Sequence, residues 1–443
     1  MGQFPSSLFA TMSNVEGSKN DRAWERLFTT HTLLERLREA PCVEISATEI
    51  NAVREARLMT KFDHTTQLPE LFRANHLAIL PTSRGTYTIG HFLAYQRFDT
   101  SRVPILHIKP TLSLESLRPE LVSNESSAIL LALHLGILKH FTGDITPFYA
   151  SVGGRMGTGR FAFEIATRSE PIRLQVENAQ VEIDAGYESA QALYLIEAKN
   201  HLADDFIVRQ LYYPYRLWQA RVKKPVRLIY LTYSDGTFHL REYRFLAPEV
   251  YSSIALVRSQ RYRIDDEAFS LSSLRSLLAN TRPEAEPHLP FPQADSFERL
   301  INLCEILYSQ APIDKPSITQ RYGFVARQTD YYLAAGRYLG LIEEVGIGRS
   351  GRFRLTQRGQ WIFSQPLYGR HIALLEKLFV HPPFRAVCEA YLAGEGKPLA
   401  TEQVMALVAP WLPRLSESTL RRRAATVVAW LGWLRYDLEG AVL

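Results

Sequence analysis

Two carboxylates and a lysine lie at a spacing that suits hydrolysis of a phosphoryl group. Asp184 ends one strand-like run, and thirteen residues later Glu197 and Lys199 lie near the end of the next. Alternate residues of a strand face the same side, so Glu197 and Lys199 can converge on one point beside Asp184. Such oxygen ligands suit Mg²⁺, which polarises a phosphoryl oxygen and lowers the pKa of an attacking water. Lys199 can orient that water and offset transition-state charge.

The same pattern has a plain alternative interpretation. Asp, Glu and Lys are common residues, and an incidental Glu-x-Lys ion pair on a solvated edge gives the same letters. Leu193, Leu195 and Ile196 are apolar, which indicates a buried strand. A Glu and a Lys at the end of a buried strand need a partner or a metal, and this favours the functional interpretation.

The pattern resembles the PD-(D/E)XK nuclease superfamily. Asp184 matches the PD-type aspartate, and Glu197-x-Lys199 matches the (D/E)XK motif, with Ile183 where the superfamily's proline often stands. Glu125, at the start of a preceding helix, matches the acidic residue that members often carry before the core sheet.

The surrounding sequence extends this resemblance over most of the chain. Gln210, on the helix after the Glu-x-Lys motif, with Tyr213 or Tyr215, is similar to the Gln/Tyr pair of some members. The strings EIDAGYE, LIEAKN and RQLYYPYRLW look like those of a bacterial type II restriction endonuclease family with C-terminal winged helices.

The resemblance implies a sequence-specific, Mg²⁺-dependent endonuclease that hydrolyses phosphodiester bonds of double-stranded DNA in phage defence. Asp184 and Glu197 are then the metal ligands, and Lys199, Glu125 and Gln210 complete the catalytic site. Cleavage of both strands takes two active sites or two visits of one, and a homodimer on DNA is the expectation. A cognate methyltransferase is expected without direct contact. Two alternatives stay open: a non-catalytic winged-helix regulator with a vestigial nuclease core, and a modification-dependent or repair nuclease.

These residues need a multi-domain α/β (α+β) framework. We expect an N-terminal DNA-recognition or clamp domain at 1–115 and a nuclease domain with a mixed sheet flanked by helices at 116–285. The proline-rich stretch 280–293 then precedes two winged-helix modules, 294–365 and 366–443, whose repeat is YLGLI against WLGWL. Apolar spacing predicts helices over 24–39 and 127–141 and from the capping box at Ser46 to about Phe62. It also predicts a hairpin over 77–90 and strands over 160–166, 172–176, 226–233 and 237–245.

Basic side chains in these modules are the candidate DNA contacts. Arg54, Arg57 and Lys61 are spaced as one stripe of the predicted 46–62 helix. The glycine-rich segment 153–160 is either a flexible loop that approaches phosphates or a surface hairpin with ordinary arginines. The full set of candidates is Arg54, Arg57, Lys61, Arg155, Arg160, Arg327, Gln328, Arg349, Arg352, Arg421 and Arg422.

Composition excludes several classes of protein. The 443 residues are 46% hydrophobic and 22% charged, with a net charge of 51 − 46 = +5, which permits an anionic partner. Three scattered cysteines make a disulfide framework and a zinc site improbable and favour a reducing interior. The longest apolar runs are too short for a bilayer, and no secretory signal is visible, so a cytoplasmic protein is expected.

Overall fold

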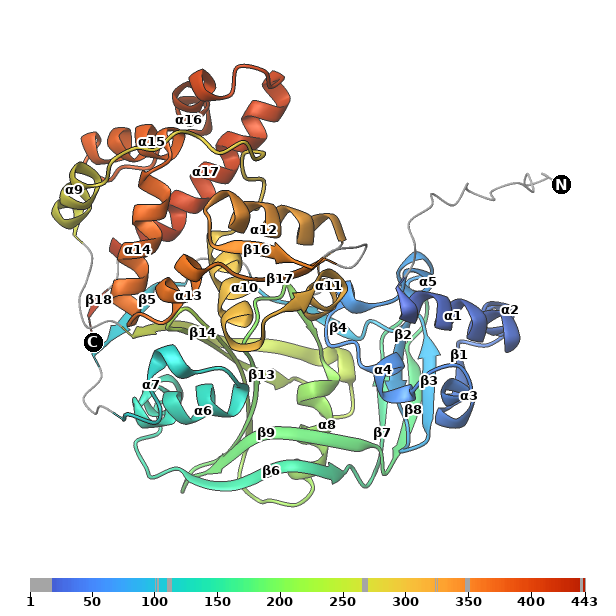
Figure 1. The fold of residues 1–443 in the computed structure, drawn as a ribbon. Helices are drawn as coiled ribbons and strands as arrows, with labels where there is room; N and C mark the ends of the chain where they lie inside the picture. Colours follow the sequence, from blue (N-terminus) through green and yellow to red (C-terminus); the bar gives the residue numbers. More distant parts are fainter. Residues whose placement is uncertain are drawn as a thin grey trace.

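A large mixed β-sheet organises the chain, with helices on both of its faces (Figure 1). The computed structural model describes residues 18–99, 101, 103–109, 114–264, 270–322, 324, 326–346, 351–438 and 441–442. Within these residues, helices and strands mix along the chain in an α+β arrangement. No described helix carries an apolar stretch that could cross a bilayer.

The central sheet has eight strands in the order β18-β5-β14-β13-β12-β10-β9-β6. The pairs β6/β9, β9/β10, β12/β13 and β13/β14 are antiparallel, whereas β10/β12, β14/β5 and β5/β18 are parallel. The strands are β5 (Ile105–Ile108), β6 (Tyr149–Gly157), β9 (Gln180–Glu188), β10 (Leu193–Lys199), β12 (Val226–Ser234), β13 (Thr237–Phe245), β14 (Ile254–Ile264) and β18 (Ala441–Val442).

Alternating side chains of β10 and β12 fill two separate cores. Tyr194 and Ile196 pack on one face with α6 (Glu125–His134) and α7 (Ile137–Thr142). Leu193 and Leu195 pack on the other face with α8 (Arg209–Gln219), which connects the parallel strands β10 and β12. A parallel neighbour requires such a crossover, and α8 is the helix that the sequence predicts there. The strands predicted around β9, β10, β12 and β13 are confirmed.

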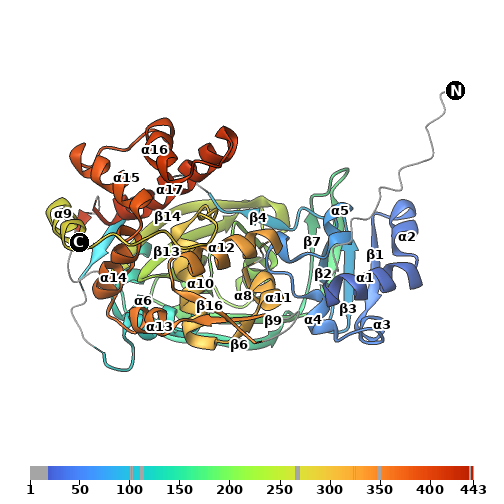
Figure 2. The ribbon, with the colours of Figure 1, turned by 45° about the horizontal axis from the view of Figure 1, so that its top comes forward.

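The N-terminal unit packs at one end of the central sheet (Figure 2). Its three-stranded sheet has the order β1-β3-β2, and the predicted 77–90 hairpin is confirmed as β2 and β3. Trp24, Phe28 and Phe72 form its aromatic core. The elements are α1 (Lys19–Thr30), α2 (Leu33–Glu39), β1 (Cys42–Ser46), α3 (Ala47–Asn51), α4 (Ala56–Thr60), η1 (Thr65–Gln67), α5 (Glu70–Ala74), β2 (Ala78–Pro81) and β3 (Thr86–Gly90).

Two predicted helices of this unit are interrupted. The helix predicted over 24–39 breaks at Thr32, which adopts φ 47° between α1 and α2. The continuous helix predicted from Ser46 to about Phe62 is wrong, because the Asn51 side chain accepts a hydrogen bond from the Ala56 N–H (2.7 Å) and closes a turn between α3 and α4. Arg54 lies in that turn, so the predicted basic stripe does not follow one helix.

The glycine-rich segment is largely regular structure. Residues 153–157 belong to β6, which pairs with β9 through two irregularities in register, and Arg160 begins the next strand. That strand, β7 (Arg160–Ile165), pairs with β8 (Ile172–Glu177), and β4 (Tyr95–Arg97) pairs with β11 (Asp205–Ile207) near the N-terminal unit. The segment is therefore a sheet edge with a turn at its end, and the flexible-loop interpretation is wrong.

Downstream of residue 270 the chain is mainly helical and shares a single hydrophobic core. Its three-stranded sheet has the order β15-β17-β16. The described residues between 366 and 438 contain helices and no strand, and β18 joins the central sheet. The elements are α9 (Leu271–Asn280), α10 (Phe297–Gln310), β15 (Ile313–Asp314), α11 (Lys315–Tyr322), α12 (Ala326–Tyr338), β16 (Ile342–Val345), β17 (Arg352–Leu355), α13 (Gln357–Phe363), α14 (Leu367–Phe379), α15 (Pro382–Ala393), α16 (Thr401–Val408) and α17 (Glu417–Leu438).

Candidate active site at the C-terminal end of strand β10

The acidic residues and the lysine singled out in the sequence lie together. Glu197 and Lys199 are among the last three residues of β10. Their strand partners on β12 are Tyr230 and Thr232. Asp184 is on β9, and its Oδ2 accepts a hydrogen bond from the Ala198 N–H (2.8 Å), which fixes it beside β10.

The Lys199 ammonium group lies between carboxylates from different elements. Its Nζ is 2.5 Å from Glu197 Oε1 and 3.7 Å from Oε1 of Glu125, the first residue of α6. The Gln210 side chain, on the first turn of α8, donates to the same Glu197 oxygen at 2.7 Å. The five candidate catalytic residues therefore meet at one point, at the C-terminal end of β10 and beside the middle of β9. Asp184 does not end its strand as expected, because β9 continues to Glu188.

Burial strongly affects the pKa values of the charged groups in this cluster. The Glu197 and Lys199 side chains are each 9% exposed. Burial, with Asp184 and Asp63 nearby, outweighs the attraction of Lys199 and raises the pKa of Glu197 to about 8. Burial alone would lower the pKa of Lys199, but the surrounding negative charge keeps that pKa well above its ordinary value. The cluster thus contains more carboxylate groups than ammonium groups, and Glu197 keeps a proton at neutral pH.

Several polar atoms around the cluster are buried without a hydrogen-bond partner among the described residues. They include Gln210 Oε1, the Tyr230 hydroxyl and both side-chain polar atoms of Asn200. Buried polar groups are nearly always hydrogen-bonded, and unpaired ones mark places where water, an ion or a ligand completes the arrangement. Their concentration beside Glu197 indicates a functional site rather than an incidental ion pair.

The N-terminal unit adds residues that the sequence interpretation missed. Asp63, which follows α4, is buried and interacts electrostatically with Lys199, and Lys199, Lys61 and His64 hold its pKa below the ordinary value despite burial. His64 Nε2 lies 2.8 Å from Nε2 of His201, two residues beyond Lys199, and burial lowers the pKa of both imidazoles. Asp63 lies between Lys61 and His64 in the sequence, and this charged segment was the only local sign of a functional residue. Its electrostatic interaction with Lys199 on β10 joins positions more than 130 residues apart.

The candidate DNA contacts of the first two domains differ in their surroundings. Lys61, the C-cap of α4, lies close enough to influence Asp63 and Glu125. Arg57 is on α4, and Arg54 is in the turn that precedes it. Arg155 pairs with Glu182 (3.3 Å) and Arg160 pairs with Glu177 (2.5 Å) across neighbouring strands. Their charges are compensated by glutamates on the neighbouring strands. Because β6 pairs with β9 and β7 pairs with β8, the segment is not a hairpin either.

The candidates of the C-terminal region are mostly exposed. Arg327, on the first turn of α12, contacts the Tyr331 hydroxyl and ring, with Gln328 beside it. Arg352 is exposed on β17, and Arg349 lies outside the described residues. The arginines of α17 are also exposed: Arg421 pairs with Glu402 (2.7 Å), and Arg422 donates to the Thr419 hydroxyl (3.2 Å).

The residues present suit a divalent cation that takes part of its shell from water and substrate. No three His, Cys, Asp or Glu side chains of the described chain form a ready-made metal cage. Mg²⁺ in phosphoryl-transfer sites commonly uses one or two carboxylates together with substrate phosphate and water. Asp184 and Glu197 provide two such carboxylates. Burial is the main cause of the raised pKa of Glu197, with Asp184 adding to it, and a bound cation would favour the ionised carboxylate.

Family comparisons match three successive parts of the chain. Each matching family is described as a domain of unknown function: DUF6996 over residues 21–89, DUF6997 over 90–263 and DUF7226 over 299–438. No curated protein and no solved structure matches the chain. The five clustered residues all lie within the DUF6997 match, whereas Asp63 lies within the DUF6996 match.

Proposed function

We propose that the chain is a sequence-specific, Mg²⁺-dependent DNA endonuclease of the PD-(D/E)XK superfamily, acting as a type II restriction enzyme. The observation that carries the proposal is the meeting of Asp184, Glu197 and Lys199 on two adjacent strands, with Gln210 hydrogen-bonded to Glu197. This arrangement gathers two candidate metal ligands and one buried ammonium group on a single point.

The order of elements around that point supports the proposal. Helices α6 and α7 precede the antiparallel strands β6, β9 and β10, and α8 then leads to β12, which is parallel to β10. This is the mixed, helix-flanked sheet that the resemblance implies. Farther on, α10, β15, α11, α12 and the β16/β17 pair follow the order of a winged helix, whereas the second proposed module has the helices of that order without its hairpin.

In this proposal, Asp184 and Glu197 hold Mg²⁺, which supplies Lewis-acid stabilisation of the phosphoryl group. Gln210 fixes the orientation of the Glu197 carboxylate through its 2.7 Å hydrogen bond. Lys199 orients the attacking water and balances the charge that develops on the phosphate. Glu125, 3.7 Å from Lys199, keeps that ammonium group charged and directed toward the site.

Two regions near the site are candidates for holding DNA. Asp63 of the N-terminal unit interacts electrostatically with Lys199, and the Gln67 side chain donates to the Gln320 carbonyl of α11 (3.0 Å). Exposed Arg327 and Arg352 then face solvent from the same module as α11. We propose that these two regions read or clamp double-stranded DNA in the cytoplasm, with a homodimer cutting both strands and a separate methyltransferase protecting host DNA.

The test is digestion of unmethylated phage DNA with purified protein, in Mg²⁺ and in EDTA. Discrete fragments that require Mg²⁺ support a sequence-specific endonuclease, and Asp184→Ala and Lys199→Ala should each abolish them while gel-shift binding remains. Fragments that survive both substitutions would overturn the assignment. Binding without cleavage favours the regulator with a vestigial core, and cleavage of methylated DNA alone favours a modification-dependent enzyme.

A further inference from the structure

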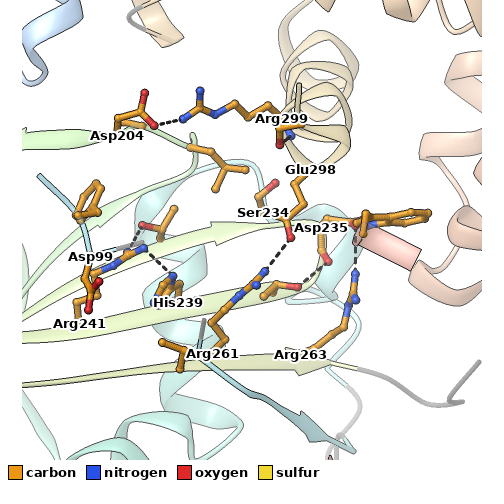
Figure 3. A pocket seen from close by; sticks show the side chains of 18 of the residues that line it. Asp99, Asp204, Ser234, Asp235, His239, Arg241, Arg261, Arg263, Glu298 and Arg299 are labelled. Atoms are coloured by element: carbon orange, nitrogen blue, oxygen red, sulfur yellow. Dashed lines mark hydrogen bonds and ion pairs between the residues drawn. The ribbon is translucent and has the colours of Figure 1, made fainter. Parts of the chain in front are cut away.

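A second concave site lies on the same sheet, beyond the acidic cluster. It is a cavity of about 450 Å³ between the ends of β12 to β14, the loops that follow β4 and β10, and the start of α10 (Figure 3). Thr232, one of its wall residues, is the strand partner of Lys199. The volume is that of a small-molecule site rather than of a single ion.

Arg241, on β13, is the unusual residue of this cavity. It is 8% exposed, and none of the described carboxylates forms an ion pair with it. Its guanidinium group donates to Thr232 Oγ1 (3.3 Å) and His239 Nδ1 (2.6 Å) and stacks over the Phe98 ring, while Nε has no hydrogen-bond partner. Burial lowers the pKa of Arg241 to about 10, which still leaves the group charged at neutral pH.

The histidine beside Arg241 does not offset that charge. His239 Nδ1 accepts from Arg241, and Nε2 lies 2.7 Å from the Ser259 hydroxyl, so the imidazole is neutral. Burial, with Arg241 and Arg261 nearby, lowers the pKa of His239 to about 2. Arg241 is therefore a buried cation whose hydrogen-bond partners are neutral, with Asp99 of the same wall acting on it only through longer-range electrostatics. Burying a charge without a direct ion pair is costly unless an opposite charge is supplied.

The other arginines of the cavity wall have carboxylate partners. Arg261 pairs with Glu298 (2.9 Å), Arg263 with Asp235 (3.4 Å) and Arg299 with Asp204 (2.5 Å). Figure 3 shows these pairs around the cavity, with Arg241 among them. The wall as a whole carries four arginines and five carboxylates, but Arg241 has no ion pair to a described carboxylate, and an anionic group beside its unpaired Nε would supply one.

Two further features favour an anion. The 14-residue helix α10 begins at the cavity wall, where Ser296 is its N-cap, and a helix N-terminus carries partial positive charge. The planar guanidinium fork suits two oxygens of one phosphate or carboxylate. Hydroxyl groups of Ser101, Thr237 and Ser234 and the Trp433 side chain line the remaining space, which offers hydrogen bonds to a sugar and an apolar surface for a base.

We propose that this cavity binds a phosphate-bearing nucleotide, with Arg241 as the residue that receives the phosphate. The phosphate group can belong to a free mononucleotide or to one nucleotide unit of a bound strand. The proposal does not rest on nuclease activity, because the cavity and Arg241 are independent of Asp184 and Glu197.

The test is calorimetric titration of the full chain carrying Asp184→Ala, in EDTA, so that cleavage plays no part. The ligands are 2′-deoxyadenosine 5′-monophosphate, 2′-deoxyadenosine, and a six-nucleotide single strand without terminal phosphates. The monophosphate should bind saturably and the nucleoside should not. Arg241→Gln should weaken phosphate binding at least about tenfold, because a charge-assisted hydrogen bond is lost.

Arg244→Gln is the matched control, since Arg244 is exposed on the same strand and does not line the cavity. It should leave binding unchanged, while Arg241→Lys, which keeps the charge without the fork, should give an intermediate affinity. Binding of the monophosphate identifies the free nucleotide as the source, and Arg241-dependent binding of the strand alone identifies a phosphodiester. If no ligand binds in an Arg241-dependent manner, the proposal is overturned.

Thermal unfolding without ligand separates this role from a structural one. An arginine that stabilises the fold should lower the midpoint temperature when it is replaced. A buried cation that awaits an anion should not, so Arg241→Met should unfold at the same or a higher temperature than the parent while losing phosphate binding. A lower midpoint with unchanged phosphate binding would contradict the proposal.

Discussion

The central sheet buries two charge imbalances of opposite sign. At the C-terminal end of β10, Glu197 and its acidic neighbours exceed the single ammonium group of Lys199, and the cluster keeps a proton. On β13, Arg241 is buried with neutral hydrogen-bond partners and no ion pair to a described carboxylate, and its pKa falls. Both sites are costly for the isolated chain, because charge is buried without full compensation. We therefore propose that the first site receives a cation and the second an anion.

The largest effect expected at the acidic site is on cleavage. Asp184→Asn removes one of the two carboxylates while it keeps the shape of the side chain and its hydrogen bond to the Ala198 N–H. Mg²⁺-dependent cleavage should fall by about 10⁴-fold, as for loss of one essential catalytic group. Initial rates of plasmid cleavage at fixed Mg²⁺ measure this.

A matched control for that substitution lies two residues earlier on the same strand. Glu182 is exposed and pairs with Arg155 at 3.3 Å, so Glu182→Gln changes a carboxylate to an amide outside the cluster. Its cleavage rate should equal that of the parent protein. Equal losses in both variants would show that Asp184 acts only through the structure of β9.

Lys199 should be the main stabilising charge of the acidic site. Lys199→Met leaves several buried carboxylates uncompensated, which typically costs about 3–5 kcal/mol of unfolding free energy. The loss should be larger at pH 9 than at pH 6, because the folded-state pKa of Glu197 is about 8 and the protonated carboxyl carries no charge to compensate. Urea unfolding at the two pH values measures the difference.

Lys224→Met serves as the control for this stability effect. Lys224 pairs with Glu188 at 2.6 Å, but both side chains are 39% exposed, and exposed pairs contribute less than about 1 kcal/mol. Its effect should be small and nearly the same at pH 6 and pH 9. A loss for Lys199→Met that did not change with pH would argue against a proton held by the cluster.

The contrast between the two sites also explains what the sequence could predict. Asp184, Glu197 and Lys199 lie on strands that are neighbours along the chain, and the period of two places Glu197 and Lys199 on one face. These relations are local, so they could be read from spacing alone. Gln210, the second residue of α8, is also close along the chain, but its role was implied by the resemblance.

The remaining features depend on contacts between distant segments. Asp63 reaches β10 across more than 130 residues, and β5 and β18 join the sheet edge from opposite ends of the chain. The break at Asn51 depends on one side-chain hydrogen bond that competes with helix propensity. Arg241 looks like an ordinary strand arginine until α10 and the loop after β10 close the cavity around it.

Binding of Mg²⁺ should release a proton from the acidic site. Burial raises the pKa of Glu197 to about 8, so below that pH the carboxyl must lose a proton before it can bind the cation. The apparent dissociation constant should therefore fall about tenfold per pH unit from about pH 6 to about pH 8 and then level off. Calorimetry in buffers of different ionisation enthalpy counts the protons. Glu197→Gln should release none, and proton release that persists in this variant would place the titrating group elsewhere.

The smallest expected effect concerns exposed arginines on the proposed DNA-binding surface. Arg327 has no carboxylate partner among the described residues, whereas Arg160 already pairs with Glu177 at 2.5 Å. A phosphate contact releases counterions, so Arg327→Gln should reduce the slope of log binding constant against log salt by about one unit. Arg160→Gln should leave that slope unchanged and alter unfolding free energy by less than about 1 kcal/mol. Gel-shift titrations of catalytically inactive protein at several salt concentrations measure both slopes. Equal decreases in the two slopes would show that Arg160 gives up its ion pair with Glu177 and contacts DNA. An ion pair within the folded chain would then not predict which arginines bind DNA.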